Sequence, residues 1–310
     1  NESAASDALT ISVDTAAPAA PSKPDLDASS DTGRSNTDNL TSDKTPTFTG
    51  TAEAGSSVEL FAGTSSLGTT TADNTGNWTF TVDSSEAFSD ASYAITAKAT
   101  DVAGNVSSAS ASLSITIDTS TVIPSTPDLA LSSDTGNSNT DNITGDTTPT
   151  FTGTSEAGST VELFAGSSSL GTTTADSSGN WSFTADTSDA FTDGSHAITA
   201  TATDVAGNES DVSLLELNVD STAPSLTINL DPSSDTGVSN RDQITSDTTP
   251  MLTGTTEPDA LVELSTETLS LGSTTADASG NWIFVVDSPL AEGSHHINVS
   301  ATHVAGNISA

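Results

Sequence analysis

Three near-identical stretches of the sequence gather carboxylates that could bind a cation. The first begins at Ser30 and reads SDTGRSNTDNLTSDKTPTFTG, and its copies begin at Ser133 and Ser234. Each stretch is polar and offers little apolar surface to bury. Clustered carboxylates in a partly desolvated loop repel one another unless a cation neutralises them or protons bind. The aspartates are Asp31, Asp38 and Asp43, then Asp134, Asp141 and Asp146, and finally Asp235, Asp242 and Asp247.

Further acidic residues recur in shorter loops and directly before proline-containing linkers. The strand pattern described below predicts seven-stranded sandwiches, in which successive strands finish at opposite ends of the domain. The shorter loops therefore lie at the end that faces the preceding domain, and the long stretches lie at the end that faces the following domain. We therefore expect carboxylates to converge where domains meet. All the donors are hard oxygens, which favours Ca2+ over zinc or magnesium. The additional predicted calcium ligands are Asp14, Glu53, Asp73, Asp101, Asp118, Glu156, Asp176, Asp204, Asp220, Glu257 and Asp277.

The third repeat departs from the pattern at one position. The sequence VAGN follows Asp101 and Asp204 in the first two repeats, but it follows His303 in the third. A neutral imidazole is a poor ligand for calcium. We therefore expect the junction between the second and third domains to bind calcium more weakly, or differently, than the junction before it.

The acidic residues also have a simpler interpretation as a solvated surface. The chain of 310 residues carries 42 Asp and Glu against 5 Lys and Arg, a net charge of -37. Such a surface favours solubility and repels nucleic acid and anionic membranes, and no apolar run is long enough for membrane insertion. For isolated acids such as Glu59 and Glu162 we prefer this interpretation, and for the repeated loops we prefer ion binding.

The elements that position these loops repeat with the same period. Trp78, Trp181 and Trp282 stand in equivalent TAD-x-x-GNW blocks, and a repeat of about 100 residues is the size of an independent domain. Apolar and Thr-rich positions alternate with a period of two, which is typical of half-buried antiparallel strands. We interpret each Trp as a core anchor. The strands expected in the first repeat are Lys23–Ala28, Pro46–Thr51, Ser57–Ala62, Ser66–Ala72, Asn77–Val82, Ser92–Thr100 and Ala111–Ile117.

About seven short strands per repeat predict an all-β fold of tandem seven-stranded immunoglobulin-like β-sandwiches, arranged as an extended rod. The chain has no Cys, and its cores are poor in aromatic residues, so bound ions would add stability that small domains need. Calcium at the junctions would also stiffen the rod. The expected domains are residues 18–120, 121–222 and 223–310, preceded by residues 1–17 as the last strand of an earlier repeat plus a linker.

The ends of the sequence are out of phase with these domains. NESAASDALTISVD at the start aligns with NVSSASASLSITID, which contains the last strand of the first domain, while the third domain stops before its own last strand. We therefore predict that residues 8–14 of one molecule could complete the third domain of another by strand addition.

Four motifs in register carry a family resemblance: TPTFTGTAEAGSSVELFAG, TADNTGNW, ATDVAGN and LSITIDTS. They resemble the bacterial immunoglobulin-like (BIg) repeats of giant surface adhesins secreted by type I systems, with the biofilm-associated proteins as looser relatives. The resemblance covers nearly the whole chain. It implies a secreted protein at the bacterial cell surface, calcium between neighbouring repeats, and a spacer that carries a tip for host-cell glycans or receptors. His303 leaves one expected ligand in doubt.

Two classes of function remain open. In the first, the repeats are a calcium-stiffened spacer of an adhesin, which the repetition of the same loops favours. In the second, the repeats themselves bind a glycan or receptor. The sequence does not indicate an enzyme, because its histidines lack a neighbouring nucleophile motif and no HExxH metalloprotease motif is present.

Overall fold

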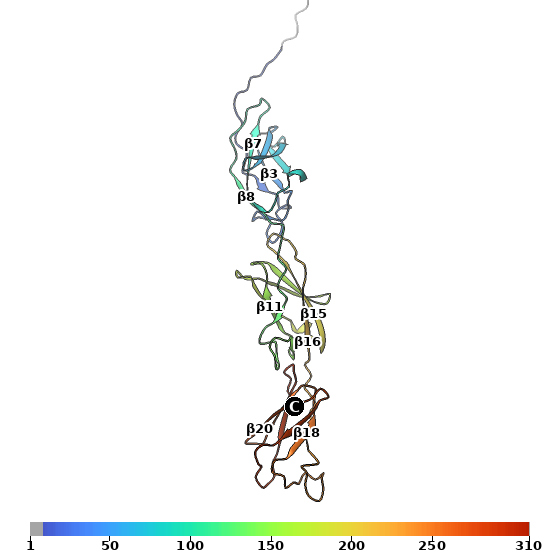
Figure 1. Cartoon of the computed structure of the whole chain (residues 1–310). Helices are drawn as coiled ribbons and strands as arrows, with labels where there is room; N and C mark the ends of the chain where they lie inside the picture. The colour runs from blue at the N-terminus through green and yellow to red at the C-terminus, as the bar shows by residue number, and fades with distance from the viewer. Residues whose placement is uncertain (1–8, 310) are drawn as a thin grey trace, which may run out of the picture. The chain divides into compact units, whose positions relative to one another are not determined.

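The computed structural model describes residues 9–309, which fold into three successive β-sandwich repeats (Figure 1). By its internal contacts the chain divides into two compact units. Unit 1 runs from the start of the described residues to Val122 and adds Gly158–Thr160 and Ala202–Ser210. Unit 2 contains Ile123–Ala157, Val161–Thr201 and the residues from Asp211 onward. Among the described residues, no helix is long and apolar enough to cross a membrane.

The first repeat is a sandwich of a three-stranded and a five-stranded sheet. The strand orders are β1-β3-β6 and β2-β8-β7-β4-β5. All neighbours are antiparallel except β2 and β8, which run parallel. The elements are β1 (Asp25–Leu26), β2 (Leu40–Thr41), β3 (Thr47–Thr51), β4 (Ser57–Ala62), β5 (Ser65–Thr71), β6 (Asn77–Thr81), the 3-10 turn η1 (Ser84–Glu86), β7 (Ala91–Thr100) and β8 (Leu113–Ile117).

Alternation of side chains builds the core of this sandwich. Along β6, Trp78 and Phe80 are buried while the residues between and beside them are exposed. Successive strand residues point to opposite faces, so this pattern turns one face of the strand into the core. Trp78, Trp181 and Trp282 are only 2%, 3% and 1% exposed, which confirms the prediction that they are core anchors.

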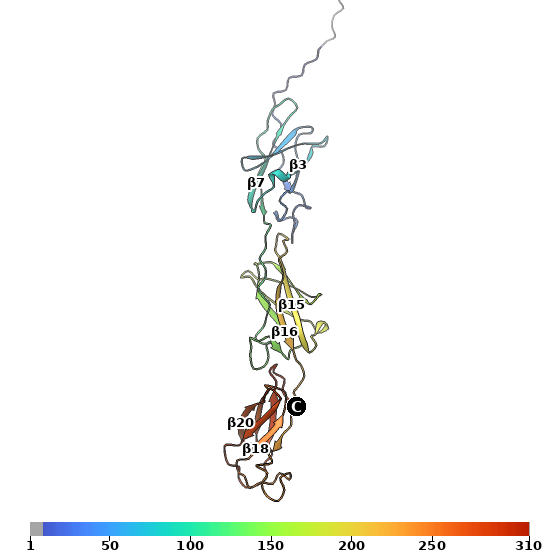
Figure 2. The ribbon, with the colours of Figure 1, turned by 45° about the vertical axis from the view of Figure 1, so that its right-hand side comes forward.

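The second repeat has the same two sheets, with strand orders β14-β11-β9 and β10-β16-β15-β12-β13. Figure 2 shows its strands β15 and β16 side by side, and they pair in antiparallel register. The elements are β9 (Asp128–Leu129), β10 (Ile143–Thr144), β11 (Thr150–Thr154), β12 (Thr160–Ala165), β13 (Ser168–Thr174), β14 (Asn180–Thr184), η2 (Thr187–Asp189), β15 (Gly194–Thr203) and β16 (Ser213–Val219).

The third repeat has two three-stranded sheets, β17-β18-β21 and β20-β19-β22. Within the described residues it has no counterpart of β8 or β16. The predicted strand addition remains a prediction: Leu9, Ile11 and Val13 are exposed and outside any strand, and residue 8 lies outside the described residues. The elements are β17 (Asn229–Leu230), β18 (Met251–Thr255), β19 (Leu261–Ser265), β20 (Ser270–Thr275), β21 (Asn281–Val285) and β22 (Asn298–Thr302).

All seven strands expected in the first repeat are present, and the prediction of tandem immunoglobulin-like sandwiches is confirmed. The two-residue strand β2 was not expected. It interrupts the first acidic stretch and pairs with the edge of the five-stranded sheet through Leu40 and Thr41. Thr41 is fully buried, and its hydroxyl donates to the carbonyl of Ser30. The acidic loop is therefore pinned to the sandwich at its middle.

Candidate functional site

The loop between β1 and β2 holds a buried carboxylate that the sheets do not satisfy. Asp31 is 4% exposed, and its Oδ1 atom is buried without a hydrogen-bond partner. Its Oδ2 atom accepts one hydrogen bond, from the backbone N–H of Asn39 at 3.2 Å. A buried charged oxygen without a partner is unfavourable, so this position calls for a proton or a cation.

The electrostatic environment of Asp31 also favours a proton or a cation at this position. Burial raises the pKa of Asp31, and the negative charges of Asp38 and Asp25 add to the rise, while the hydrogen bond from Asn39 opposes it. Asn39 has a φ of 62°, a left-handed conformation that Asn tolerates better than most residues. A cavity of about 260 Å³ opens beside Asp31, and its lining includes Asp25, Asn36 and Asn39.

The second and third repeats place the same side chains in the same way. Asp134 is 4% exposed with both carboxylate oxygens unpartnered, and Asp235 is 5% exposed with one unpartnered oxygen. Burial raises the pKa of Asp134, and the charges of Asp141 and Asp128 raise it further. The third repeat carries Asn229 in β17 where the others carry Asp25 and Asp128. At this strand position the third repeat therefore offers an amide instead of a carboxylate.

The other predicted aspartates of these stretches take two different places. Asp38, Asp141 and Asp242 are exposed, and each accepts the backbone N–H two residues later. Asp43, Asp146 and Asp247 close the base of the loop: in each, Oδ2 accepts a serine hydroxyl at 2.8 Å and Oδ1 accepts a backbone N–H of the following turn.

The sequence prediction omitted Asp25 and Asp128. They stand in the first short strand of their repeats, outside the conspicuous acidic stretches. In the folded chain the charge of Asp25 raises the pKa of Asp31, and the charge of Asp128 raises the pKa of Asp134. Their only sequence signal is the recurrence of PDL before the stretches.

The tip of the same loop makes backbone contacts within each compact unit. In unit 1, the hydroxyl of Thr32 donates to the carbonyl of Ala206 at 2.8 Å, and the N–H of Arg34 donates to the carbonyl of Val205 at 3.2 Å. Gly33 lies between them at φ +93°, where a Cβ atom would be 2.2 Å from the Val205 oxygen. This glycine lets the two backbones approach.

Unit 2 repeats the contact with the next pair of loops. The hydroxyl of Thr135 donates to the carbonyl of Ala305, and the N–H of Asn137 donates to the carbonyl of Val304 at 3.3 Å. The long acidic loop thus contacts a VAGN loop in both units. A side chain on the intervening Gly136 would collide with the Val304 carbonyl.

Most of the remaining predicted ligands act in their own turns. Asp73, Asp176 and Asp277 are exposed and accept backbone N–H groups two and four residues later. The hydroxyl of Thr75 at Asp73, and these backbone bonds at all three, lower the pKa of each. Asp101 and Asp204 accept hydrogen bonds from Asn105 and Asn208. Asp14 and Asp118 offer their main-chain carbonyls to these same asparagines at 3.3 and 2.9 Å. Glu53 is exposed and Glu156 is half-buried.

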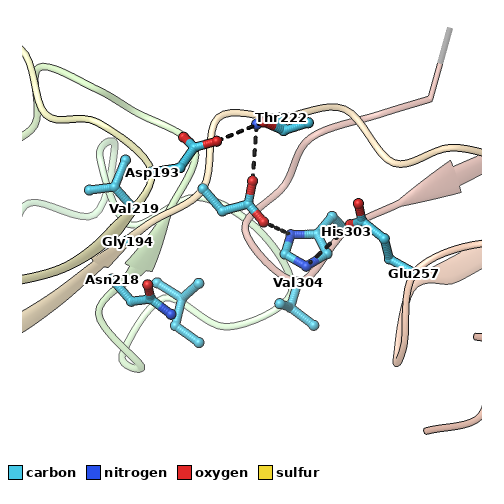
Figure 3. Close-up of a pocket in the computed structure, with 10 residues that line it drawn as sticks. Asp193, Gly194, Asn218, Val219, Thr222, Glu257, His303 and Val304 are labelled. Atoms are coloured by element: carbon cyan, nitrogen blue, oxygen red, sulfur yellow. Dashed lines mark hydrogen bonds and ion pairs between the residues drawn. The ribbon is translucent and has the colours of Figure 1, made fainter. Parts of the chain in front are cut away.

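One group of side chains converges closely on the VAGN loop of the third repeat, inside unit 2 (Figure 3). Asp220 Oδ2 lies 3.2 Å from His303 Nδ1, and Glu257 Oε2 lies 3.5 Å from His303 Nε2. Within the part of the chain that the structure describes, this is the only group of three such residues whose ligand atoms all lie within 4.8 Å of one another. The group borders a cavity of about 520 Å³ that Asp193 and Thr222 also line. The structure thus brings together two predicted ligands and the histidine that departs from the pattern.

The fold and the loops together define a class of protein: tandem all-β sandwiches whose repeated loops are acidic. The family model described as "Bacterial Ig-like domain" matches residues 17–119, 121–221 and 222–310. The chain therefore belongs to the family of bacterial immunoglobulin-like domains. A search of curated proteins found no match.

Solved structures of large adhesins are among those similar to the chain. A Ca2+-stabilised adhesin with which an Antarctic bacterium binds ice is 23% identical with a TM-score of 0.42, covering 96% of this chain and 72% of that one. A 1.5-MDa bacterial ice-binding adhesin is 22% identical with a TM-score of 0.38, covering 93% and 95%. A tetra-tandem repeat from the extending region of a large adhesion protein is 26% identical with a TM-score of 0.30, covering 94% and 72%. The assignment to the family depends on the family match and not on these TM-scores.

Proposed function

We propose that the chain is a spacer segment of a large bacterial surface adhesin, in which bound Ca2+ stiffens an extended rod of tandem domains. The observation that carries this proposal is the buried aspartate with an unpartnered oxygen, repeated as Asp31, Asp134 and Asp235. A cation removes the cost of burying such an oxygen. A receptor site needs to occur only once, whereas a structural site benefits every repeat.

The residues around each buried aspartate fit calcium in their chemistry. Every donor is a carboxylate, an amide or a backbone oxygen, which are the ligands that calcium takes in flexible geometry. The orphaned oxygen of the buried aspartate is the position that requires a cation most. Calcium, when bound, supplies two positive charges and stabilises the folded state by mass action. The residues that would hold it are Asp25, Asp31 and Asp38, then Asp128, Asp134 and Asp141, and then Asn229, Asp235 and Asp242.

The segment acts outside the cell, at the bacterial surface, and host-cell glycans or receptors are bound by other parts of the full-length protein. The net charge of -37 and the absence of cysteine are compatible with this location. The four sequence motifs that resemble the repeats of giant type I-secreted adhesins support it. We further propose that the repeats are related to those of the Salmonella non-fimbrial adhesin SiiE, and that the full-length protein has roles in virulence and biofilm formation.

The alternative, a glycan-binding module built from the repeats, has less support. Sugar recognition commonly uses an exposed aromatic face, but all three Trp residues are buried. Tyr93 packs against Phe88 with ring centroids 4.4 Å apart, and its hydroxyl is held by Ser89. The aromatic side chains most suited to a sugar platform therefore serve the core.

Thermal unfolding of the chain with excess calcium, excess magnesium or a chelator tests the proposal, with small-angle scattering of the same samples. Calcium at about 100 times its dissociation constant should stabilise the repeats that bind it by about 2.7 kcal/mol. We expect a higher melting temperature and a stiffer scattering profile in calcium than in magnesium or chelator.

The matched variant carries Asp31→Asn, Asp134→Asn and Asp235→Asn together. It should fold and should lose most of the calcium response. If the wild-type chain unfolds at the same temperature in all three solutions, the ion-stiffened spacer is wrong and the acidic loops return to the solubility interpretation. A response that magnesium reproduces fully would overturn the choice of calcium.

A further inference from the structure

The loop that carries His303 keeps its shape without the aspartate found in the other repeats. In those repeats, Asp101 and Asp204 fasten the loop by accepting the backbone and side-chain N–H groups of Asn105 and Asn208. The turn itself persists in the third repeat. The backbone N–H of His303 donates to the carbonyl of Asn307 at 2.8 Å, and the N–H of Gly306 donates to the carbonyl of His303 at 2.9 Å. These backbone hydrogen bonds hold the turn, and the imidazole adds only the bond that its Nδ1 atom accepts from the N–H of Ala305.

The imidazole instead stands between two carboxylates from distant parts of unit 2. Asp220 follows β16 directly, and Glu257 lies in the loop between β18 and β19. The Nδ1 atom lies toward Asp220 and the Nε2 atom toward Glu257, at the 3.2 and 3.5 Å given above, and Figure 3 shows His303 beside Glu257. The backbone N–H of Ala305 also donates to Nδ1, at 3.3 Å.

The surroundings do not supply the positive charge that this arrangement requires. The cavity beside the group is lined by Asp193, Asp220 and Glu257 and by no Lys or Arg. The Oε2 atom of Glu257 is buried and has no hydrogen-bond partner. The Asp193 carboxylate is already occupied by Ser221 and Thr222. Asp220 Oδ1 accepts the backbone N–H of Thr222 at 3.0 Å, so beside the imidazole the two carboxylates have one backbone donor and no Lys or Arg along the cavity.

We propose that His303, Asp220 and Glu257 bind a divalent metal of the zinc class, one that accepts imidazole nitrogen. One nitrogen with two carboxylate oxygens and water is a ligand set that zinc accepts and calcium disfavours. One ring nitrogen and one oxygen of each carboxylate lie within 4.8 Å of one another. A tetrahedral site with metal–ligand bonds of about 2.0–2.2 Å places its ligand atoms roughly 3.3–3.5 Å apart, so small side-chain rotations would bring these three atoms around a single ion. The proposal is independent of the calcium proposal, because it uses different side chains and a different ion.

The test is a zinc titration of the full chain, stripped of metal, at pH 7.5 in competition with a chromophoric chelator. Excess calcium is present throughout, so that the oxygen-only loops are saturated. We expect one zinc ion per chain that calcium does not displace. His303→Ala and Glu257→Gln should each weaken binding by about tenfold or more, in line with the weight of metal-site residues. X-ray absorption at the zinc edge should show one imidazole among oxygen ligands.

His296→Ala is the matched control, since His296 is exposed on the same repeat and should leave zinc binding unchanged. His303→Asp restores the residue of the first two repeats, so it should fold, lose zinc selectivity and keep the calcium response. Circular dichroism checks the folding of each variant. Zinc binding that survives in His303→Ala, that calcium competes away, or that is absent from the wild-type chain overturns the proposal. None of these results bears on the proposed function, because that function is tested by the calcium dependence of the melting temperature.

Discussion

At the scale of single residues, the described carboxylates with a shifted pKa fall into two electrostatic kinds. Ten of them sit in turns and loops where N–H and hydroxyl groups lower their pKa, as at Asp83, where Ser85 donates through both its backbone and its side chain. Asp31 and Asp134 differ, because burial and neighbouring carboxylates raise their pKa. The first kind stabilises the folded chain by itself, and the second kind stabilises it only with a proton or a cation.

The substitution Asp31→Asn should have opposite effects with and without calcium. In chelator at neutral pH it removes an uncompensated buried charge, so we expect stabilisation of the first repeat by about 1 kcal/mol. A carboxyl with a raised pKa stabilises the folded state fully below its ordinary value of 3.8 and loses this contribution as pH rises through the folded-state pKa. The advantage of Asn should therefore vanish on acidification below that value. Melting curves in chelator at several pH values measure this.

In calcium the same variant should melt lower than the wild-type chain, since a ligand is lost. Asp83→Asn removes the same charge from an exposed turn and is the control. If both variants respond to calcium like the wild type, Asp31 is not a ligand.

Asp193 gives the opposite pH dependence. Hydrogen bonds from the Thr222 and Ser221 hydroxyls and the Ser221 backbone lower the pKa of Asp193 to about 2. Its contribution to stability is present above the ordinary value of 3.8 and is lost as pH falls toward 2. We expect Asp193→Asn to lower the melting temperature at pH 6 and to lower it much less at about pH 2. If the difference in melting temperature between the wild-type chain and Asp193→Asn is the same at every pH between 6 and 2, the hydrogen bonds from Ser221 and Thr222 do not act through the charge of Asp193.

At the scale of elements, the contact between the long acidic loop and the VAGN loop depends on a glycine that can bring two backbones together. Gly33→Ala should cost about 1–2 kcal/mol from left-handed backbone strain alone, and it should also break the contact with Val205. Gly104→Ala is a close match, because Gly104 has the same φ of +93° but no atom within 4 Å of its missing Cβ. Hydrogen exchange of the Arg34 amide, which donates to Val205, should accelerate in Gly33→Ala only. Equal protection in both variants would show that the loop contact contributes nothing.

The elements also show which features the sequence could predict. The strands were predictable because alternation and the Trp register are local patterns, and the acidic stretches because they recur. The role of Asp25 was not predictable, because its effect on Asp31 depends on the path of the loop around the two-residue strand β2. In the same way, the sequence marks His303 as a departure, but only the folded chain places Asp220 and Glu257 at the two sides of its ring.

At the scale of the whole molecule, repulsion among the acidic side chains opposes folding wherever cations do not screen it. With 42 acidic residues against 5 basic ones, few carboxylates have an ion-pair partner. Simple salt and calcium should relieve this repulsion in different ways. Salt screens exposed charges over the whole surface, whereas calcium neutralises the few that are buried.

The melting temperature of the chelated chain should therefore rise steeply with ionic strength. Between about 0.01 M and 0.15 M monovalent salt, the screening length falls from about 30 Å to about 8 Å, so most of the repulsion between repeated loops disappears. The calcium-loaded chain should rise less, because its most costly charges are already neutralised and because salt weakens calcium binding. Melting curves at matched ionic strengths, with and without calcium, measure the difference. Parallel slopes would show that calcium acts on the same exposed charges as salt, and the buried aspartates would then lose their place as the ion-binding groups.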